Sequence, residues 1–138
     1  MAIAVAGSLT AVAAEASVAQ AAPDHVSKTH VVKIASRHSF GRILTTVRGR
    51  SLYVLPKGSC TGPCLGIWPV LLMPKGRGHT MPTGTPCLGT AKFGNRFQVT
   101  YRHQRLYLFA EDSGSSVNGN GIGGFKVARL VLKSCPKK

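Results

Sequence analysis

The sequence predicts a small all-β domain, mostly antiparallel, built from two related hairpins and held together by disulfide bonds. Its apolar residues recur at every second position in short runs, which is typical of half-buried strands. The 138 residues include 16 glycines and 8 prolines, a composition that favours turns and strands over long helices. The four cysteines are an even number, as expected of a small exported domain stabilised by disulfides.

The N-terminal residues are expected to be a signal segment. Residues 1–22 read MAIAVAGSLTAVAAEASVAQAA, and Ala19-Gln20-Ala21 fits the small-x-small rule of signal peptidase. Because no Lys or Arg precedes Lys28, we expect residues 1–21 to be the remainder of a longer signal whose positive start lies upstream. An Ala-rich amphipathic helix is the alternative.

The mature chain is expected to be soluble and to be exported to a secreted or cell-envelope location. No later segment approaches the roughly 20 apolar residues that a membrane span needs. No cysteine follows the apolar run where a lipid anchor would attach. The chain then divides into a polar lead-in, residues 22–30, and a single β domain, residues 31–138.

The first hairpin is predicted within residues 43–55. Apolar residues alternate with a lysine in VKI, residues 32–34, which predicts a strand ahead of it. Residues 43–47 and 51–55 then flank the sequence RGR, in which Gly49 can take the positive φ of a tight turn.

The second hairpin is predicted within residues 97–109. Apolar and polar residues alternate strictly in FQVTY, residues 97–101, the clearest half-buried strand in the chain. Residues 105–109 would pair with it across a turn at residues 102–104. The remaining segments are assigned by composition: a long irregular loop at residues 73–94, a flexible loop at 113–124 and a last strand at 125–132.

The two hairpins resemble each other and predict an internal duplication. When they are aligned without gaps so that residue 43 meets residue 97, both place a basic turn and a Leu-Tyr pair at the same positions. The identical pairs are Thr46/Thr100, Arg48/Arg102, Leu52/Leu106 and Tyr53/Tyr107. The predicted repeats lie near residues 41–58 and 95–112.

The cysteines are expected to form two disulfides. Cys60, Cys64, Cys87 and Cys135 permit three pairings. The short spacing favours Cys60 with Cys64, which leaves Cys87 with Cys135.

The charge of the chain predicts an anionic partner. A formal net charge of +14 arises from 18 Lys and Arg against four Asp and Glu. Such a surface attracts nucleic acid, anionic lipid or an acidic wall polymer, and export disfavours nucleic acid. The basic pairs at the predicted turns, Arg48 with Arg50 and Arg102 with Arg105, are the candidate anion-binding residues. The alternative is that the excess charge serves solubility without a partner.

Three segments together resemble a known family. GRILTTVRGRSLYVL, SCTGPCLGIWPVLL and RFQVTYRHQRLYLFAEDSGSSVNGNGIGGF resemble, in that order, the secreted repeat of unknown function found in bacterial exported proteins and predicted lipoproteins. The resemblance covers roughly residues 41–125 and implies an exported protein without an established activity.

The motifs of that family fall on particular residues of this chain. Its Tyr-x4-Asp motif corresponds to Tyr107 and Asp112. Its Cys-x-Gly-x-Cys segment leading to Trp-Pro corresponds to Cys60, Gly62, Cys64, Trp68 and Pro69. The first hairpin departs from the pattern, because Gly58 stands where an Asp would follow Tyr53.

Redox or metal chemistry is the alternative interpretation of the cysteine segment. Thioredoxin-type redox pairs have two intervening residues at a helix N-terminus, whereas three separate Cys60 from Cys64. A structural disulfide on which Trp68 packs is therefore preferred. His79 and Met81 form a His-x-Met pair suited to copper, but oxidised cysteines cannot add thiolates. We expect no metal or other cofactor.

Catalysis is not expected either. Asp112 invites an acid/base role, but glycosidase chemistry needs two carboxylates, and few acidic residues follow the signal segment. Asp112 is expected to cap the next loop by accepting backbone N–H bonds. The G-x-G-x-x-G pattern of Gly119, Gly121 and Gly124 has no helix after it and is read as loop composition.

The preferred function is a non-catalytic cell-envelope or surface module that binds an anionic polymer or lipid headgroups. One alternative is an extracytoplasmic redox or copper protein. The other is a structural or assembly protein whose exposed Tyr and Phe edges meet partner chains.

Overall fold

The structure of the chain is a computed structural model that describes residues 4, 7 and 27–137. The expected signal segment, residues 1–21, lies outside the described residues apart from positions 4 and 7. Of the expected lead-in, residues 22–26 also lie outside them. The last residues of this expected lead-in, Lys28–His30, form a strand.

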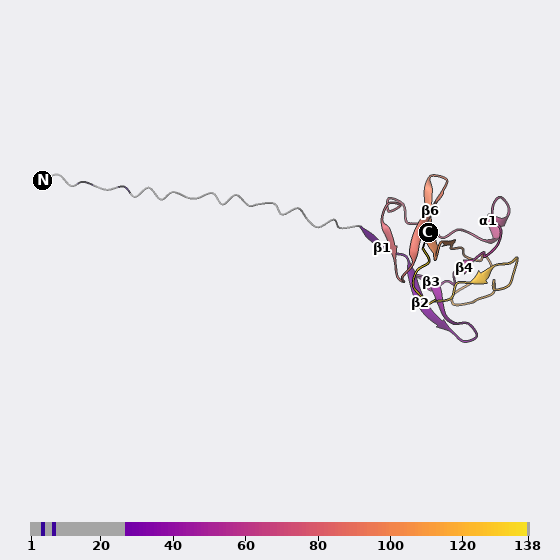
Figure 1. Cartoon of the computed structure of the whole chain (residues 1–138). Helices are drawn as coiled ribbons and strands as arrows, with labels where there is room; N and C mark the ends of the chain where they lie inside the picture. Colours follow the sequence, from indigo (N-terminus) through magenta and orange to yellow (C-terminus); the bar gives the residue numbers. More distant parts are fainter. Residues whose placement is uncertain (1–3, 5–6, 8–26, 138) are drawn as a thin grey trace.

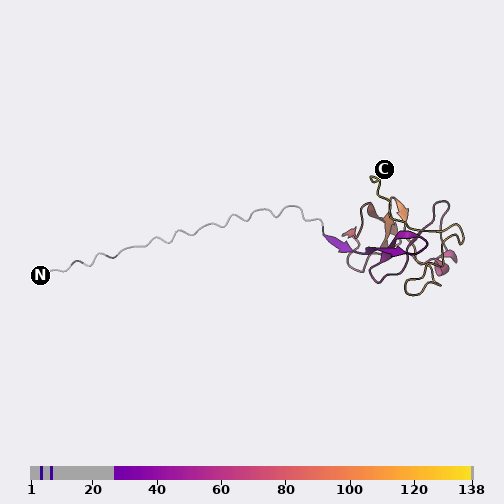
Figure 2. The ribbon, with the colours of Figure 1, turned by 90° about the horizontal axis from the view of Figure 1, so that it is seen from below.

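The prediction of an all-β, disulfide-bonded domain is confirmed. The described part contains nine strands and one short helix, α1 (Cys64–Ile67). In Figures 1 and 2, β1 and α1 lie at opposite sides of the domain. The strands are β1 (Lys28–His30), β2 (Val32–Arg37), β3 (Gly41–Thr46), β4 (Tyr53–Val54), β5 (Met81–Thr83), β6 (Leu88–Phe93), β7 (Arg96–Tyr101), β8 (Gln104–Arg105) and β9 (Lys126–Val127). No helix among the described residues has the length and hydrophobicity needed to cross a membrane.

The strands pair in small sheets that are antiparallel with one exception. β2 pairs with β3, β4 with β9, and β6, β7 and β8 form one sheet in that order. β1 and β5 pair in parallel. The β2–β3 hairpin lies at the bottom of Figure 1 and β6 at the top.

Two expectations about segments are corrected. Residues 73–94 are not one irregular loop, because β5 and β6 lie within them. The small and polar residues of β6 give no apolar alternation, and its strand conformation depends on pairing with β7. The last strand is also shorter than residues 125–132, with ladder pairing only in β9 and a single further bridge from Arg129 to Ile43.

Both predicted turns are present, with different geometries. The first turn covers residues 47–49, where Gly49 has φ +90° and the Thr46 N–H bonds to the Arg50 carbonyl at 2.8 Å. The second is tighter, because Arg102 and His103 both take positive φ, 49° and 66°, between the paired residues of β7 and β8. That conformation is typical of a two-residue type I′ hairpin.

Three segments close a ring of backbone hydrogen bonds beside the first turn. The Leu44 N–H donates to the Ala128 carbonyl at 2.8 Å, Ala128 to Leu52 at 2.8 Å, and Leu52 back to Leu44 at 3.0 Å. The ring therefore joins β3, the segment after its turn and the segment that follows β9.

A second ring with the same order lies beside the second turn. Val99 donates to Leu71 at 2.8 Å, Leu71 to Leu106 at 3.0 Å and Leu106 to Val99 at 2.9 Å. Leu106 corresponds to Leu52, as the gapless alignment requires. Leu44, however, corresponds to Val99 and not to residue 98, because the second turn is one residue shorter. That both rings descend from one duplicated repeat stays a prediction.

The core consists of two clusters that share these strands. Leu52 and Leu106 enter an aliphatic cluster, whereas the residues after them, Tyr53 and Tyr107, enter an aromatic one. The aromatic cluster contains Ile43, Tyr53, Cys60, Trp68, Tyr107, Phe109, Phe125 and Val127. β7 is buried on both faces and not half-buried as predicted: Gln98 is 0% and Thr100 8% exposed.

Both expected disulfides are present, Cys60–Cys64 and Cys87–Cys135. The second joins residues 48 apart in sequence and fixes the C-terminal tail to the start of β6. In the chain-entropy account, a loop of that length stabilises more than the short one because it restricts the unfolded chain more.

Removal of the long-range disulfide is expected to be the more costly. The Cys87→Ser/Cys135→Ser variant should lose about 4 kcal/mol of unfolding free energy, and Cys60→Ser/Cys64→Ser about 2 kcal/mol. Denaturant unfolding followed by the fluorescence of Trp68 measures both. A larger loss from the short loop would contradict this entropic ranking.

Candidate functional site

Asp112, the acidic residue of the family motif, is tied to the other hairpin. Its buried carboxylate accepts hydrogen bonds from the Tyr53 hydroxyl at 2.6 Å, the Asn118 N–H at 2.8 Å and the Ser116 hydroxyl at 3.2 Å. The bond from Asn118 is of the loop-capping kind expected for this residue. Tyr107, the tyrosine of the motif, instead packs its ring edge-on against Phe125 at 5.3 Å between centroids.

The Tyr53 hydroxyl is held as a hydrogen-bond donor. Burial first, and then its bond to Asp112, raise the pKa of this phenol well above the ordinary value of about 10. The Gly119 N–H donates to the same oxygen at 3.1 Å, so the hydroxyl both donates and accepts. Tyr53 and Asp112 therefore form a structural tie between the first hairpin and the loop after the second.

Trp68 is the centre of the aromatic cluster. Its ring stacks on Phe125 at 3.7 Å between centroids and lies 4.6 Å from Phe109 and 5.3 Å from Tyr53. A Cβ on Gly119 would come within 2.8 Å of this indole, so the backbone approaches Trp68 at a distance that only glycine allows. The cysteine segment thus serves to bring an aromatic anchor between the hairpins.

The residues of the redox and copper alternative do not form a common site among the described residues. All four cysteines are in disulfides. His79 is exposed and packs edge-on against Phe97 at 5.2 Å, and Met81 is 48% exposed in β5. Within the described residues, no three His, Cys, Asp or Glu side chains gather as a metal site would require.

The four candidate arginines are not gathered in one patch. Arg50 donates to the Phe109 carbonyl at 3.0 Å, and Arg105 donates to the Gln98 amide oxygen at 2.8 Å and the Lys92 carbonyl at 3.1 Å. The guanidinium groups of both residues therefore brace the fold. Arg48 is exposed at the first turn.

Arg102 does line a groove, together with cations that sequence analysis did not single out. This first groove has a volume of about 850 Å³, and its basic side chains are Arg102, Lys126 and Arg129. Val54 and Val127 of the paired strands β4 and β9 lie in it as apolar residues. The groove is thus a basic and apolar hollow over the β4–β9 pair.

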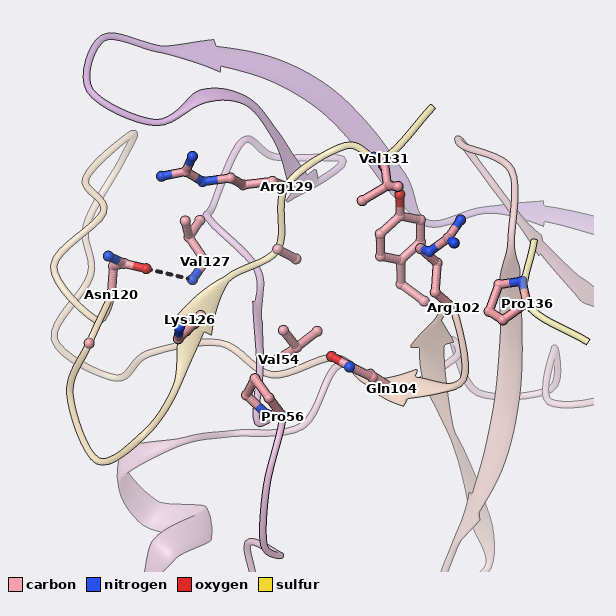
Figure 3. Close-up of a pocket in the computed structure, with 13 residues that line it drawn as sticks. Val54, Pro56, Arg102, Gln104, Asn120, Lys126, Val127, Arg129, Val131 and Pro136 are labelled. Atoms are coloured by element: carbon pink, nitrogen blue, oxygen red, sulfur yellow. Dashed lines mark hydrogen bonds between the residues drawn. The ribbon is translucent and has the colours of Figure 1, made fainter. Parts of the chain in front are cut away.

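The groove is bounded by fixed groups on both sides (Figure 3). Arg129 and Asn120 lie on one side and Arg102 and Pro136 on the other, with Val54 between them. The Asn120 side-chain oxygen accepts the Val127 N–H at 3.0 Å, which leaves its amide nitrogen as a donor. The Arg129 guanidinium lies 5.9 Å from the centroid of the Phe40 ring.

Lys126 and Arg129 were missed because they lie in a segment read only as a last strand. One local feature of the sequence does point to them: the apolar pair Val127-Ala128 is flanked on both sides by a basic residue. In the structure this pair is buried and both cations are exposed.

Comparison with protein-family models, with curated proteins and with solved structures finds no match to this chain. The resemblance to the secreted repeat therefore stays a prediction. The groove and its charges are the basis on which a function can be assigned.

The tie between Tyr53 and Asp112 gives a stability that depends on pH. Tyr53→Phe removes a buried donor from a carboxylate and should cost about 2 kcal/mol of unfolding free energy near neutral pH. Above about pH 10 the unfolded phenol ionises while the folded one stays protonated, so the wild type should lose up to about 1.4 kcal/mol per pH unit through this residue. Denaturant titrations of both proteins across that range should find their stability difference shrinking, and a constant difference would contradict the assigned protonation.

The close approach at Gly119 can be tested by adding one methyl group. Gly119→Ala should lose about 2 kcal/mol through overpacking against the aromatic cluster. Gly66→Ala is the matched control, because a Cβ there would meet nothing within 4 Å, and it should leave the stability unchanged or slightly higher. Equal effects of the two substitutions on thermal unfolding would show that the aromatic packing is loose at Gly119.

Proposed function

We propose that the chain is an exported, non-catalytic binding module of the cell envelope or cell surface. Its first groove would hold an anionic group of an envelope polymer or a lipid headgroup. The observation that supports this proposal most directly is the composition of the groove. Three cations line it, and no acidic side chain is among its described lining residues.

Charge elsewhere in the domain does little to offset these cations. The described part contains every Lys and Arg except Lys138, but only Glu111 and Asp112 of the four acidic residues. The carboxylate of Asp112 is buried and already accepts hydrogen bonds from three donors. A surface of one sign in a concave site concentrates ions of the opposite sign.

The groove also favours a ligand with an apolar body. Val54, Val127 and Val131 line it beside the cations, and binding pockets typically combine such apolar walls with a few placed polar groups. A ligand that carries an anionic group on a carbon skeleton satisfies both parts.

Export is supported by the disulfides and by the predicted signal segment. Two disulfides in a small domain are typical of oxidising compartments. The resemblance to the bacterial secreted repeat points in the same direction. In such a compartment, envelope polymers and lipid headgroups are the anions at hand, and nucleic acid is disfavoured.

A non-catalytic role is supported by the state of the carboxylates. Glu111 and Asp112 are adjacent in sequence, and Asp112 faces the interior while Glu111 faces solvent. The paired carboxylates of a glycosidase instead face one substrate from the two sides of its scissile bond. Assembly with a partner chain is the second candidate, favoured by Leu132, which is 85% exposed at the C-terminal end of the domain.

Salt-dependent binding tests the proposal. The probes are polygalacturonate and phosphatidylglycerol vesicles, with dextran and phosphatidylcholine vesicles as neutral counterparts. At least one anionic probe should bind, more weakly as salt rises, and Lys126→Gln/Arg129→Gln should weaken it about tenfold through the loss of two ion pairs.

The control is Lys28→Gln/Lys33→Gln, which removes the same charge from exposed positions on β1 and β2. It should retain most of the affinity. Equal losses in both variants would assign binding to net charge and not to the groove. A failure of both anionic probes to bind would overturn the function.

A further inference from the structure

A second groove adjoins the first. It has a volume of about 590 Å³, and Pro56 and Gln104 line both hollows. One wall is the segment of residues 58–61, which leads to the Cys60–Cys64 disulfide, and another is the turn between β6 and β7. The two grooves therefore share a boundary at Pro56 and Gln104.

The second groove is also cationic, and one of its cations is fixed in place. Its cations are Lys92 and Arg105, and His103 also lines it. Gln98, which is fully buried, accepts a hydrogen bond from the Arg105 guanidinium and donates its own N–H to the Leu106 carbonyl at 2.9 Å. This buried amide holds the guanidinium before any ligand arrives, which lowers the entropic cost of binding.

Hydroxyl and amide groups accompany the cations in both grooves. Ser59 and Thr61 are exposed and line the second groove, Asn120 lines the first, and Gln104 stands at their boundary. Apolar surface is supplied by the half-buried Leu55 and Phe93 in the second groove and by Val54 in the first. Each groove thus offers ionic, hydrogen-bonding and apolar contacts together.

A repeating ligand fits this arrangement better than a single headgroup. Each groove has the size of a site for one drug-sized molecule, about 300–1,000 Å³, so the two together exceed what one headgroup can fill. An inorganic polyanion would use the cations alone. A sugar chain with carboxylates would place its charges on the cations, its hydroxyls on the amides and hydroxyls, and its C–H faces on the apolar surface.

We infer that the ligand is an acidic polysaccharide, a linear chain of carboxylate-bearing sugars, which crosses from one groove to the other at Pro56 and Gln104. This inference rests on the proposed function and specifies its ligand. Binding in the second groove becomes intramolecular once the first is occupied, so affinity must increase with chain length until both grooves are spanned.

Both grooves have a wall attached to a disulfide. Cys60 itself lines the second groove, and Pro136, next to the bridged Cys135, lines the first. Pro136 is held further by the hydrogen bond between its carbonyl and the His103 ring at 2.9 Å. Walls anchored in this way suit a rigid, extended ligand. A site that must close around a small ligand would instead need walls that can move.

The test is calorimetric titration with galacturonate oligomers of increasing length. Three variants are compared with the wild type: Lys126→Gln/Arg129→Gln in the first groove, Lys92→Gln/Thr61→Ala in the second, and Lys28→Gln/Lys33→Gln as the control. We expect affinity to increase at least about tenfold from the shortest oligomer to one that spans both grooves. The second-groove variant should lose most of that increase.

Other outcomes would overturn the inference. Equal affinity at every length, or no effect of the second-groove variant on the longest oligomer, would indicate a single small-anion site and leave the proposed function standing. Polyphosphate binding as tightly as oligogalacturonate of equal charge would indicate a site for charge alone. Binding to phosphatidylglycerol vesicles without binding to any oligomer would indicate a membrane headgroup, and the absence of all anionic binding would overturn the proposed function as well.

Discussion

The reciprocal backbone hydrogen bonds between Tyr53 and Tyr107, at 2.8 and 2.9 Å, are the constraint on which the rest of the domain depends. They join the two hairpins where each leaves its turn. Strand alternation then sends the leucines before them into the aliphatic cluster and the tyrosine rings into the aromatic one. Val54, the next residue, lies in the first groove, and Tyr107 lines the second, so both grooves flank this junction.

The parts of the fold that could be predicted are those with a local cause. Gly49 placed the first turn, and the spacing of Cys60 and Cys64 placed a disulfide. The ladder partner of β3 was not predicted: β3 pairs with β2, and a single bridge, Thr45 to Ser51, crosses the first turn. β6 could not be found in the same way, because its strand conformation comes from β7, and β1 pairs with the distant β5. The burial of Gln98 could not be predicted, because alternation indicates a strand with one solvent-exposed face. Tertiary contacts bury both faces of β7.

The candidate site was predicted less well than the fold, for a related reason. Basic turns identify arginines that can reach solvent, but they do not reveal which guanidinium groups donate to backbone carbonyls, as those of Arg50, Arg102 and Arg105 do. The groove exists because β4 meets β9 across more than half of the domain's sequence. Only that pairing brings Lys126 and Arg129 to the surface that Arg102 also lines. The hydrogen bond of Asp112 to Tyr53 likewise joins residues that are distant in sequence.

The C-terminal segment has a consequence for the order of events during synthesis. The first hydrogen-bond ring needs Ala128, and the tail that carries Pro136 is anchored only when Cys135 reaches Cys87. Local hairpins such as β2–β3 form quickly, whereas contacts between distant residues form late. The first groove can therefore be completed only after residues 126–136 have been made. Under the proposed function, competence to bind would arise together with closure of the Cys87–Cys135 disulfide.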